Sequence, residues 1–265
     1  MDHEEDDEPE EPTQPPSSYV GYDCNDKNIF RVLSLNVQSM NNKFDAIRAI
    51  ADSTGTSILA IQEVWGQNIT TGYSIKGYHK PEIITRKTGG MNAGGGVAIW
   101  VKSSIDFQPI KVAFLEKTCE MQAILLPQPG FVIINVYRPF GDLDTFFETL
   151  EKTLEDITLS HPNCEIIMVG DFNIDLNKSS SAANRVIELG LYFDMVQQVT
   201  LPTRIQGSSQ TIIDHVYVKG KQQAISNVIM TDISDHFATI TQFHRTKIAA
   251  TPSTCLLYTS PSPRD

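Results

Sequence analysis

The sequence predicts an α/β fold in which two mixed β-sheets pack together and carry helices on their outer faces. Short apolar runs rich in β-branched residues alternate with amphipathic helical patterns in some parts of the chain, and follow one another through turns in others. The first arrangement is typical of strand–helix units and the second of antiparallel hairpins, so the sheets should be mixed. In addition, polar residues repeatedly follow the last apolar residue of a run.

The amino-terminal half supplies the first four predicted elements. A β-rich run at 29–37 begins the structure, and a helix follows, because a possible cap at Asn41-Asn42 precedes apolar residues at helical spacing. These residues are Phe44, Ile47, Ile50 and Ala51. Residues 57–63 read as a buried strand that ends on polar side chains. Gly94-Gly95-Gly96 opens a strand at 97–101; it precedes a strand and lacks Gly-Lys-Ser/Thr, so we interpret it as a turn, not a phosphate loop.

The second half begins with a predicted hairpin of strands 119–126 and 130–137 around Pro127-Gln128-Pro129-Gly130. The clearest helix comes next, with one apolar stripe made of Leu143, Phe146, Phe147, Leu150, Leu154 and Ile157. The remaining expected elements are a strand at 164–170, a shorter helix near 182–190, and strands at 211–218 and about 237–243.

Composition indicates one globular domain with a tail at each end. The chain has 265 residues, 40% apolar and 20% charged, which suits a protein with a sizeable core. No apolar stretch approaches about eighteen residues, so we expect no membrane span. The acidic, Pro-rich segment 1–28 is expected to be a disordered leader without signal-peptide features, 29–244 the domain, and 245–265 a non-domain tail, possibly foreign read-through.

Charge and cysteine usage exclude few functions. The net charge is −11, but residues 1–11 hold eight acidic and no basic side chains, so 24 acidic and 21 basic side chains remain, a net charge of −3. Such a domain lacks the excess of Lys and Arg behind broad nonspecific DNA binding, although a compact basic rim around one cleft stays open. The four cysteines show no CxxC spacing, which favours free thiols in a reducing, intracellular compartment.

The candidate functional residues stand at or just past strand ends. Gly170-Asp171-Phe172-Asn173 follows one apolar run and Ser234-Asp235-His236 follows another. The other strand-end sites are Asn36, Glu63, Tyr137-Arg138 and Asp214. Open α/β folds build active sites at such ends. Carboxylates to hold a divalent cation, a base for water and a group facing phosphate are what phosphodiester hydrolysis requires.

In this order the motifs resemble the endonuclease/exonuclease/phosphatase superfamily over about residues 29–243. They are Leu35-Asn36-Val37, Gln62-Glu63-Val64-Trp65, Val136-Tyr137-Arg138-Pro139, Gly170-Asp171-Phe172-Asn173, Ile213-Asp214-His215 and Ser234-Asp235-His236. The resemblance implies a four-layered α/β sandwich. Leu201-Pro202-Thr203-Arg204 and the Gly94–Val101 run make the chain most similar to the endonuclease domain of non-LTR (LINE-type) retrotransposons. Apurinic/apyrimidinic endonucleases often have Asp where this chain has Gln38, which disfavours a repair enzyme.

The resemblance also implies roles for single residues. Glu63, with Asn36 and Asp235, is expected to hold Mg²⁺, or Mn²⁺ as a substitute, because hard oxygen donors suit these ions. The expected catalytic residues are Asp171 as base, Asn173, Tyr137, and His236 oriented by Asp214. Arg138 is expected to bind substrate or brace its loop, and Arg204 to reach a minor groove or brace its loop. His215 should point to the opposite strand face and pack, and Asp175 should be a solvated turn residue.

The resulting hypothesis is a Mg²⁺-dependent endonuclease that nicks one DNA strand and leaves a 3′ hydroxyl. For a LINE-type protein this nick would prime reverse transcription by a downstream polymerase domain, which places the protein in the nucleus when it acts. Two alternatives stay open. The same chemistry would serve a phosphatase or phosphodiesterase acting on inositol phosphates, lipids or RNA, and a scaffold that has lost catalysis would only bind.

Overall fold

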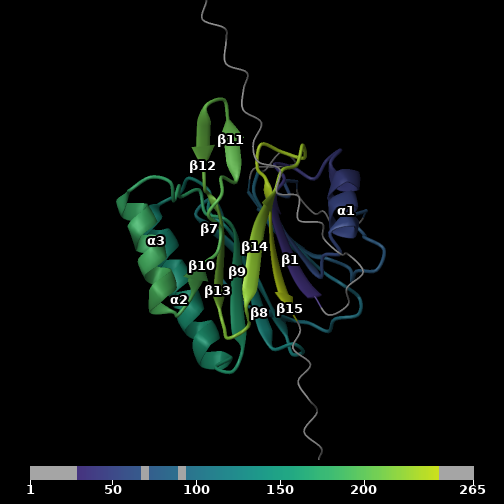
Figure 1. The fold of residues 1–265 in the computed structure, drawn as a ribbon, viewed down its shortest axis with the longest axis horizontal. Helices are drawn as coiled ribbons and strands as arrows, with labels where there is room; N and C mark the ends of the chain where they lie inside the picture. Colours follow the sequence, from purple (N-terminus) through teal and green to yellow (C-terminus); the bar gives the residue numbers. More distant parts are fainter. Residues whose placement is uncertain (1–28, 67–71, 89–93, 245–265) are drawn as a thin grey trace, which may run out of the picture.

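A computed structural model describes residues 29–66, 72–88 and 94–244 (Figure 1). The predicted leader 1–28 and tail 245–265 lie outside these ranges. The elements are β1 (Ile29–Asn36), α1 (Phe44–Ser53), β2 (Ile58–Gln62), β3 (Glu82–Ile84), β4 (Val97–Val101), β5 (Gln108–Ile110), β6 (Phe114–Leu115), β7 (Cys119–Leu126), β8 (Phe131–Tyr137), α2 (Leu143–Ser160), β9 (Glu165–Asp171), α3 (Ser181–Tyr192), β10 (Val196–Gln197), β11 (Arg204–Gln206), β12 (Ser209–Thr211), β13 (Asp214–Lys219), β14 (Ala224–Ile229) and β15 (Ala238–His244).

The strands form two main sheets and a small hairpin. The first sheet has the order β14-β15-β1-β2-β4-β3, and the second has the order β10-β13-β9-β8-β7-β5, with β6 also paired to β7. β1 runs parallel to β2, and β8 runs parallel to β9. Antiparallel pairs surround both, for example β1 with β15 and β13 with β9. Both sheets are therefore mixed, as predicted, and β11 and β12 form a separate hairpin.

The core shows why the layers stack in this order. On β1, Phe30 and Val32 belong to the buried cluster between the two sheets, whereas Leu33 and Leu35 belong to a cluster under α1. This alternation follows from the two-residue period of a strand. A third cluster joins the outer face of the second sheet to α2 and α3 (Figure 1). The result is the predicted four-layered sandwich with helices outside. No helix in the described ranges is long and apolar enough to cross a membrane.

One predicted element is wrong in its extent. The expected strand 211–218 is interrupted, because β12 ends at Thr211 and β13 begins at Asp214. The backbone N–H groups of Ile213 and Asp214 donate to the side-chain oxygen of Thr203, at 3.1 and 3.0 Å, instead of to a neighbouring strand. Side-chain acceptors thus replace the ladder at this point, and β13 starts on the residue that the site uses.

Candidate active site

The polar strand ends meet at one edge of the sandwich. Asn36 ends β1 and Tyr137 ends β8, and each strand has its parallel neighbour beside it. In register, Asn36 lies opposite Gln62, so Glu63 follows at the next position, and Tyr137 lies opposite Asp171. Because parallel strands end together, each sheet delivers its polar residues to the same edge.

Asn36 links the two sheets. Its Nδ2 donates to Glu63 Oε1 at 2.8 Å and to Asp171 Oδ2 at 2.8 Å, while its Oδ1 accepts the backbone N–H of Gln38 at 3.0 Å. Asn36 is completely buried, so these bonds hold the two carboxylates on either side of one amide. Glu63 has a φ of 55°, in the left-handed region that costs a non-glycine residue about 1–3 kcal/mol.

Asp171 lies below the surface at the end of β9. It is completely buried, and its Oδ1 accepts the backbone N–H of Asn173 at 2.9 Å. The Asn173 side chain donates to Asp171 Oδ2 at 3.2 Å and to the Arg138 carbonyl at 2.8 Å. Burial, followed by the negative charge of Asp214, raises the pKa of Asp171 well above its ordinary value. A carboxylate with a raised pKa is a stronger proton acceptor once it is ionised.

His236 and Asp214 form a buried pair. The ring Nδ1 lies 2.9 Å and 3.1 Å from the two carboxylate oxygens of Asp214. Burial acts to lower the pKa of His236, but the carboxylates of Asp214, Asp171 and Asp235 outweigh it and raise that pKa to about 9. The imidazole is therefore cationic near neutral pH. Its contact with Asp214 uses Nδ1 and does not involve Nε2. Ligand atoms of Asp171, Asp214 and His236 all lie within 4.8 Å of one another.

Two hydroxyl groups for which no role was predicted, those of Thr203 and Ser234, hold the segments around Asp214, Asp235 and His236 in place. Thr203 is completely buried, and its Oγ1 accepts the backbone N–H of Asp214, while its carbonyl accepts that of Phe237. Ser234 Oγ donates to the carbonyl of Asn36 at 2.5 Å. Thr203 thus joins the Asp214 and His236 segments, and Ser234 joins the Asp235 loop to β1. The only sequence signal for them was that Thr203 lies in Leu201-Pro202-Thr203-Arg204 and Ser234 lies in Ser234-Asp235-His236.

Asp235 and Arg204 are paired with each other. Two guanidinium nitrogens of Arg204 lie 2.7 and 2.5 Å from Asp235 Oδ2. Burial acts to raise the pKa of Asp235, but Arg204 and His236 lower it below its ordinary value. Arg204 is 28% exposed, so its contact with a minor groove stays a prediction beside the loop-bracing role seen here.

Tyr137 and Arg138 have different surroundings. Burial, and then the charges of Glu63 and Asp171, raise the pKa of Tyr137 far above its ordinary value. The phenol therefore keeps its proton and can donate it in a hydrogen bond. Arg138 is nearly buried and donates to the carbonyls of Phe172 and Asn173, at 3.3 and 3.2 Å. It braces the loop; a contact between Arg138 and substrate stays a prediction.

The donor set fits a hard divalent cation. Glu63, Asn36 and Asp235 supply carboxylate and amide oxygens, the ligands that Mg²⁺ and Mn²⁺ take. Asp235 Oδ1 is buried and lacks a hydrogen-bond partner among the described residues, with His236 Nε2 3.9 Å away. Asp214 and His236 contact each other instead, so the Asp171, Asp214 and His236 cluster is better suited to proton handling than to holding an ion.

Two neighbouring predictions were also resolved. His215 is completely buried, stacks on Phe172 with ring centroids 4.6 Å apart, and bonds through Nε2 to the Ile174 carbonyl at 2.8 Å. Its predicted packing role is confirmed. Asp175 is not simply solvated, because its Oδ1 accepts the backbone N–H groups of Asn177 and Ile212. Its side chain is only 13% exposed and braces the loop after Asn173.

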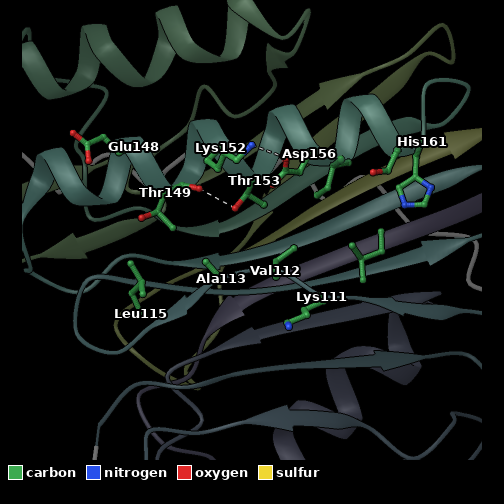
Figure 2. A pocket seen from close by; sticks show the side chains of 13 residues that line it. Lys111, Val112, Ala113, Leu115, Glu148, Thr149, Lys152, Thr153, Asp156 and His161 are labelled. Atoms are coloured by element: carbon green, nitrogen blue, oxygen red, sulfur yellow. Dashed lines mark hydrogen bonds and ion pairs between the residues drawn. The ribbon is translucent and has the colours of Figure 1, made fainter.

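A separate groove lies away from this edge. It has a volume of about 630 Å³ and runs between α2 and the segment from Ile110 to Leu115. Figure 2 shows Lys152 and Asp156 paired on the helix side and Lys111 on the strand side. None of the site residues described above lines it. We therefore place the chemistry at the strand ends and not in this groove.

Sequence and structure comparisons agree with this geometry. The profile of the Endonuclease/Exonuclease/phosphatase family matches residues 33–236. The chain belongs to that family. Its hydrolases act on phosphodiester bonds and are typically dependent on divalent metals, which suits the donor set above. Comparison with curated protein sequences gave no match.

Solved structures of family members share the fold at low identity. A 3′-5′ exonuclease (NExo) from Neisseria meningitidis is 19% identical with a TM-score of 0.64, covering 81% of this chain and 99% of the other. The endonuclease domain of TRAS1, a telomere-specific non-LTR retrotransposon, is 15% identical with a TM-score of 0.60, covering 81% and 98%. A mannosyl-6-phosphatase from Bacteroides thetaiotaomicron is 14% identical with a TM-score of 0.59, covering 81% and 99%.

Proposed function

We propose that this protein is a Mg²⁺-dependent DNA endonuclease that nicks one strand and leaves a 3′ hydroxyl. The observation that carries the proposal is a proton acceptor next to a proton donor. The acceptor is buried Asp171, whose pKa is raised, the donor is cationic His236, and a carboxylate oxygen of Asp171 lies within 4.8 Å of a ring nitrogen of His236. Similarity to the TRAS1 endonuclease domain supports the choice of DNA and of a retrotransposon context.

The side chains divide the reaction between them. Asp171 Oδ2 accepts a proton from the attacking water, with Asn173 and Asn36 fixing that carboxylate from both sides. The water oxygen bonds to phosphorus, the bond from phosphorus to the 3′ oxygen breaks, and that oxygen takes up a proton from solvent. His236 Nε2 and the Tyr137 hydroxyl donate hydrogen bonds to the phosphate oxygens as negative charge grows on them.

Mg²⁺ would be held by Glu63, Asn36 and Asp235. When bound, the ion supplies positive charge that polarises the phosphate. Holding the ion on Glu63 and the base on Asp171 separates the two tasks, and Asn36 bonds to both carboxylates.

The nick would supply a primer for reverse transcription. We propose that a reverse transcriptase domain of the same polyprotein extends the 3′ hydroxyl and that the reaction takes place in the nucleus. Substrate shape would be read by the segments that border the edge, of which the β11–β12 hairpin is one.

Nicking of supercoiled plasmid tests the proposal. The wild-type chain should convert plasmid to the open-circle form with Mg²⁺ and not with excess chelator. Asp171→Asn keeps the side-chain volume but removes the base, and should lower the rate at least ~100-fold. The exposed residue Glu151 offers a matched control, because Glu151→Gln removes a carboxylate from α2, a helix that carries none of the site residues. Equal nicking by wild type and Asp171→Asn would refute the assignment.

A phosphatase is the second candidate, since the mannosyl-6-phosphatase shares the fold to a similar degree. A panel of sugar phosphates, inositol phosphates and RNA oligonucleotides, assayed beside duplex DNA, separates the candidates. Release of phosphate from a small ester without DNA nicking would replace the endonuclease proposal. A binding scaffold without catalysis would leave every substrate intact.

A further inference from the structure

Trp65 is an aromatic side chain at the edge of the site that the reaction above does not use. It stands two residues after Glu63 and is 37% exposed, while the other tryptophan, Trp100, is completely buried and bonds to the Tyr73 carbonyl. A single exposed apolar residue is ordinary on a protein surface. The contacts that hold the Trp65 side chain in place, however, are unusual for an exposed residue.

Contacts fix the indole in place. Its Nε1 donates to Glu63 Oε2 at 2.8 Å, and its backbone N–H donates to the Gly95 carbonyl at 2.9 Å. A Cβ atom on Gly94 would lie 3.6 Å from Nε1, so the indole edge rests against this glycine. Trp65 also has a φ of 52°, a left-handed conformation that is unusual for a bulky residue. The ring is therefore preorganised beside a predicted metal ligand.

The glycine segment that receives Trp65 is itself anchored in the core. Buried Glu120 accepts the backbone N–H of Gly96 at 2.6 Å and pairs with the Arg86 guanidinium. A Cβ atom on Gly95 would overlap the Arg86 side chain, so only glycine fits there. The position of the indole consequently depends on the ion pair between Arg86 and buried Glu120.

A second exposed aromatic residue, Phe140, follows the end of β8 in the other sheet. Phe140 is 85% exposed and stands three residues after Tyr137. Its loop is fixed by the bond from Asn173 to the Arg138 carbonyl and by close packing of Gly141 against Lys117. Hydrolysis of a phosphate ester requires no aromatic surface, whereas an unpaired nucleobase gains affinity by stacking on one.

We propose that Trp65 is a stacking platform for an unpaired nucleobase next to the scissile phosphate. The preferred substrate class is then nucleic acid with an unstacked base, as in a bulge or a single-stranded junction, rather than a fully paired duplex. This inference rests on the proposed nucleic-acid substrate and deepens it. Base–aromatic stacking of this kind changes affinity by roughly 5- to 150-fold when the ring is removed.

Tryptophan fluorescence tests the inference without turnover. The full chain is titrated, in excess chelator, with a duplex that carries one unpaired base, with the same duplex fully paired, and with inorganic phosphate. The unpaired base should quench emission from Trp65 and bind more tightly than the paired duplex. Emission that remains in Trp65→Phe comes from buried Trp100 and should not change.

Three variants sharpen the result. Trp65→Ala should weaken binding of the unpaired-base duplex roughly 5- to 150-fold and that of the paired duplex less than about 2-fold. Trp65→Phe loses the bond to Glu63 but keeps a ring, and should stay within about 5-fold of wild type. Tyr192→Ala, on an exposed ring at the end of α3, should bind as wild type does.

The outcomes separate this inference from the proposed function. Absence of quenching, or equal weakening of both duplexes by Trp65→Ala, overturns the stacking role even if plasmid nicking succeeds. Selective quenching by the unpaired base supports the stacking role even if nicking fails, in which case only the endonuclease assignment falls.

Discussion

The buried imidazole of His215 should make the fold sensitive to mild acid. Burial lowers the pKa of His215 to about 4 from the ordinary value of 6.5, although bonds to the Ile174 and Ile212 carbonyls oppose this. The unfolded chain therefore binds a proton below about pH 6.5 that the folded chain refuses until about pH 4. Stability rises with pH wherever the unfolded state binds more protons, so this residue costs stability as the pH falls through that window.

The size of the effect follows from the two pKa values. Between about pH 7.5 and pH 5, the refused proton costs about 2 kcal/mol, and the full difference of 2.5 pKa units corresponds to about 3.4 kcal/mol at lower pH. His215→Gln retains a donor for the Ile174 carbonyl but cannot titrate. The variant should be less stable than wild type at both pH values, because it lacks the ring contact with Phe172. However, its free energy of unfolding should fall by about 2 kcal/mol less than that of wild type between about pH 7.5 and pH 5.

Urea denaturation of both proteins at the two pH values measures this difference. Other titrating groups, including Asp171 and His236, are common to both proteins and cancel in the comparison. His161→Gln serves as a matched control, since this histidine caps the end of α2, away from the active-site edge. If wild type and His215→Gln lost equal stability on acidification, the buried neutral state of His215 would be refuted.

Four further outcomes are expected. Asp214→Asn removes the principal charge that keeps His236 protonated, so kcat of nicking near neutral pH should fall at least ~10-fold with little change in KM. Gly170→Ala should cost about 3 kcal/mol or more in urea unfolding, because φ is 141° and the new Cβ would lie 1.9 Å from the Val136 carbonyl oxygen. Glu120→Ala should cost about 3–5 kcal/mol by leaving the Arg86 guanidinium, which is only 11% exposed, without its partner, and Glu120→Gln should recover part of that loss. Ser180→Ala should cost about 1 kcal/mol, because its side chain caps α3, while leaving nicking unchanged.

Much of this site was predictable because its residues follow strands directly. Asp171 ends an apolar run whose burial is obvious from composition, and Asn36 does the same on β1. The apolar stripe of α2 identified its buried face, and the mixture of hairpins with strand–helix units predicted two mixed sheets with helices outside, whereas the four layers were implied by the family resemblance. These features depend only on residues that are close together in the sequence, so they can be predicted from it.

The parts that were missed depend on contacts between distant residues. Thr203 accepts from Asp214 across eleven positions, and Ser234 donates to Asn36 across 198. Neither hydroxyl has a local pattern that distinguishes it from a surface residue. The short strands β3, β5, β6 and β10 were also missed, since each has two or three residues and mostly half-buried or exposed side chains. Their pairing is decided by the neighbouring strand and not by their own sequence.

A site divided between two sheets requires a polar connection, because apolar packing alone specifies the relative position of two sheets loosely. A polar connection of this kind lies directly behind the edge where the candidate site residues meet. Gln62 Nε2 donates to Asn135 Oδ1 at 2.6 Å, and Asn135 Nδ2 donates to the carbonyls of Ile61 and Ala98 at 3.0 and 3.2 Å. Both amides are buried, so sliding the sheets would leave several polar groups without partners, each at a cost of about 1–3 kcal/mol. Gln62 comes directly before Glu63, and Asn135 comes two residues before Tyr137. The bonds that fix the two sheets therefore also fix the position of Glu63, the predicted metal ligand, relative to Tyr137.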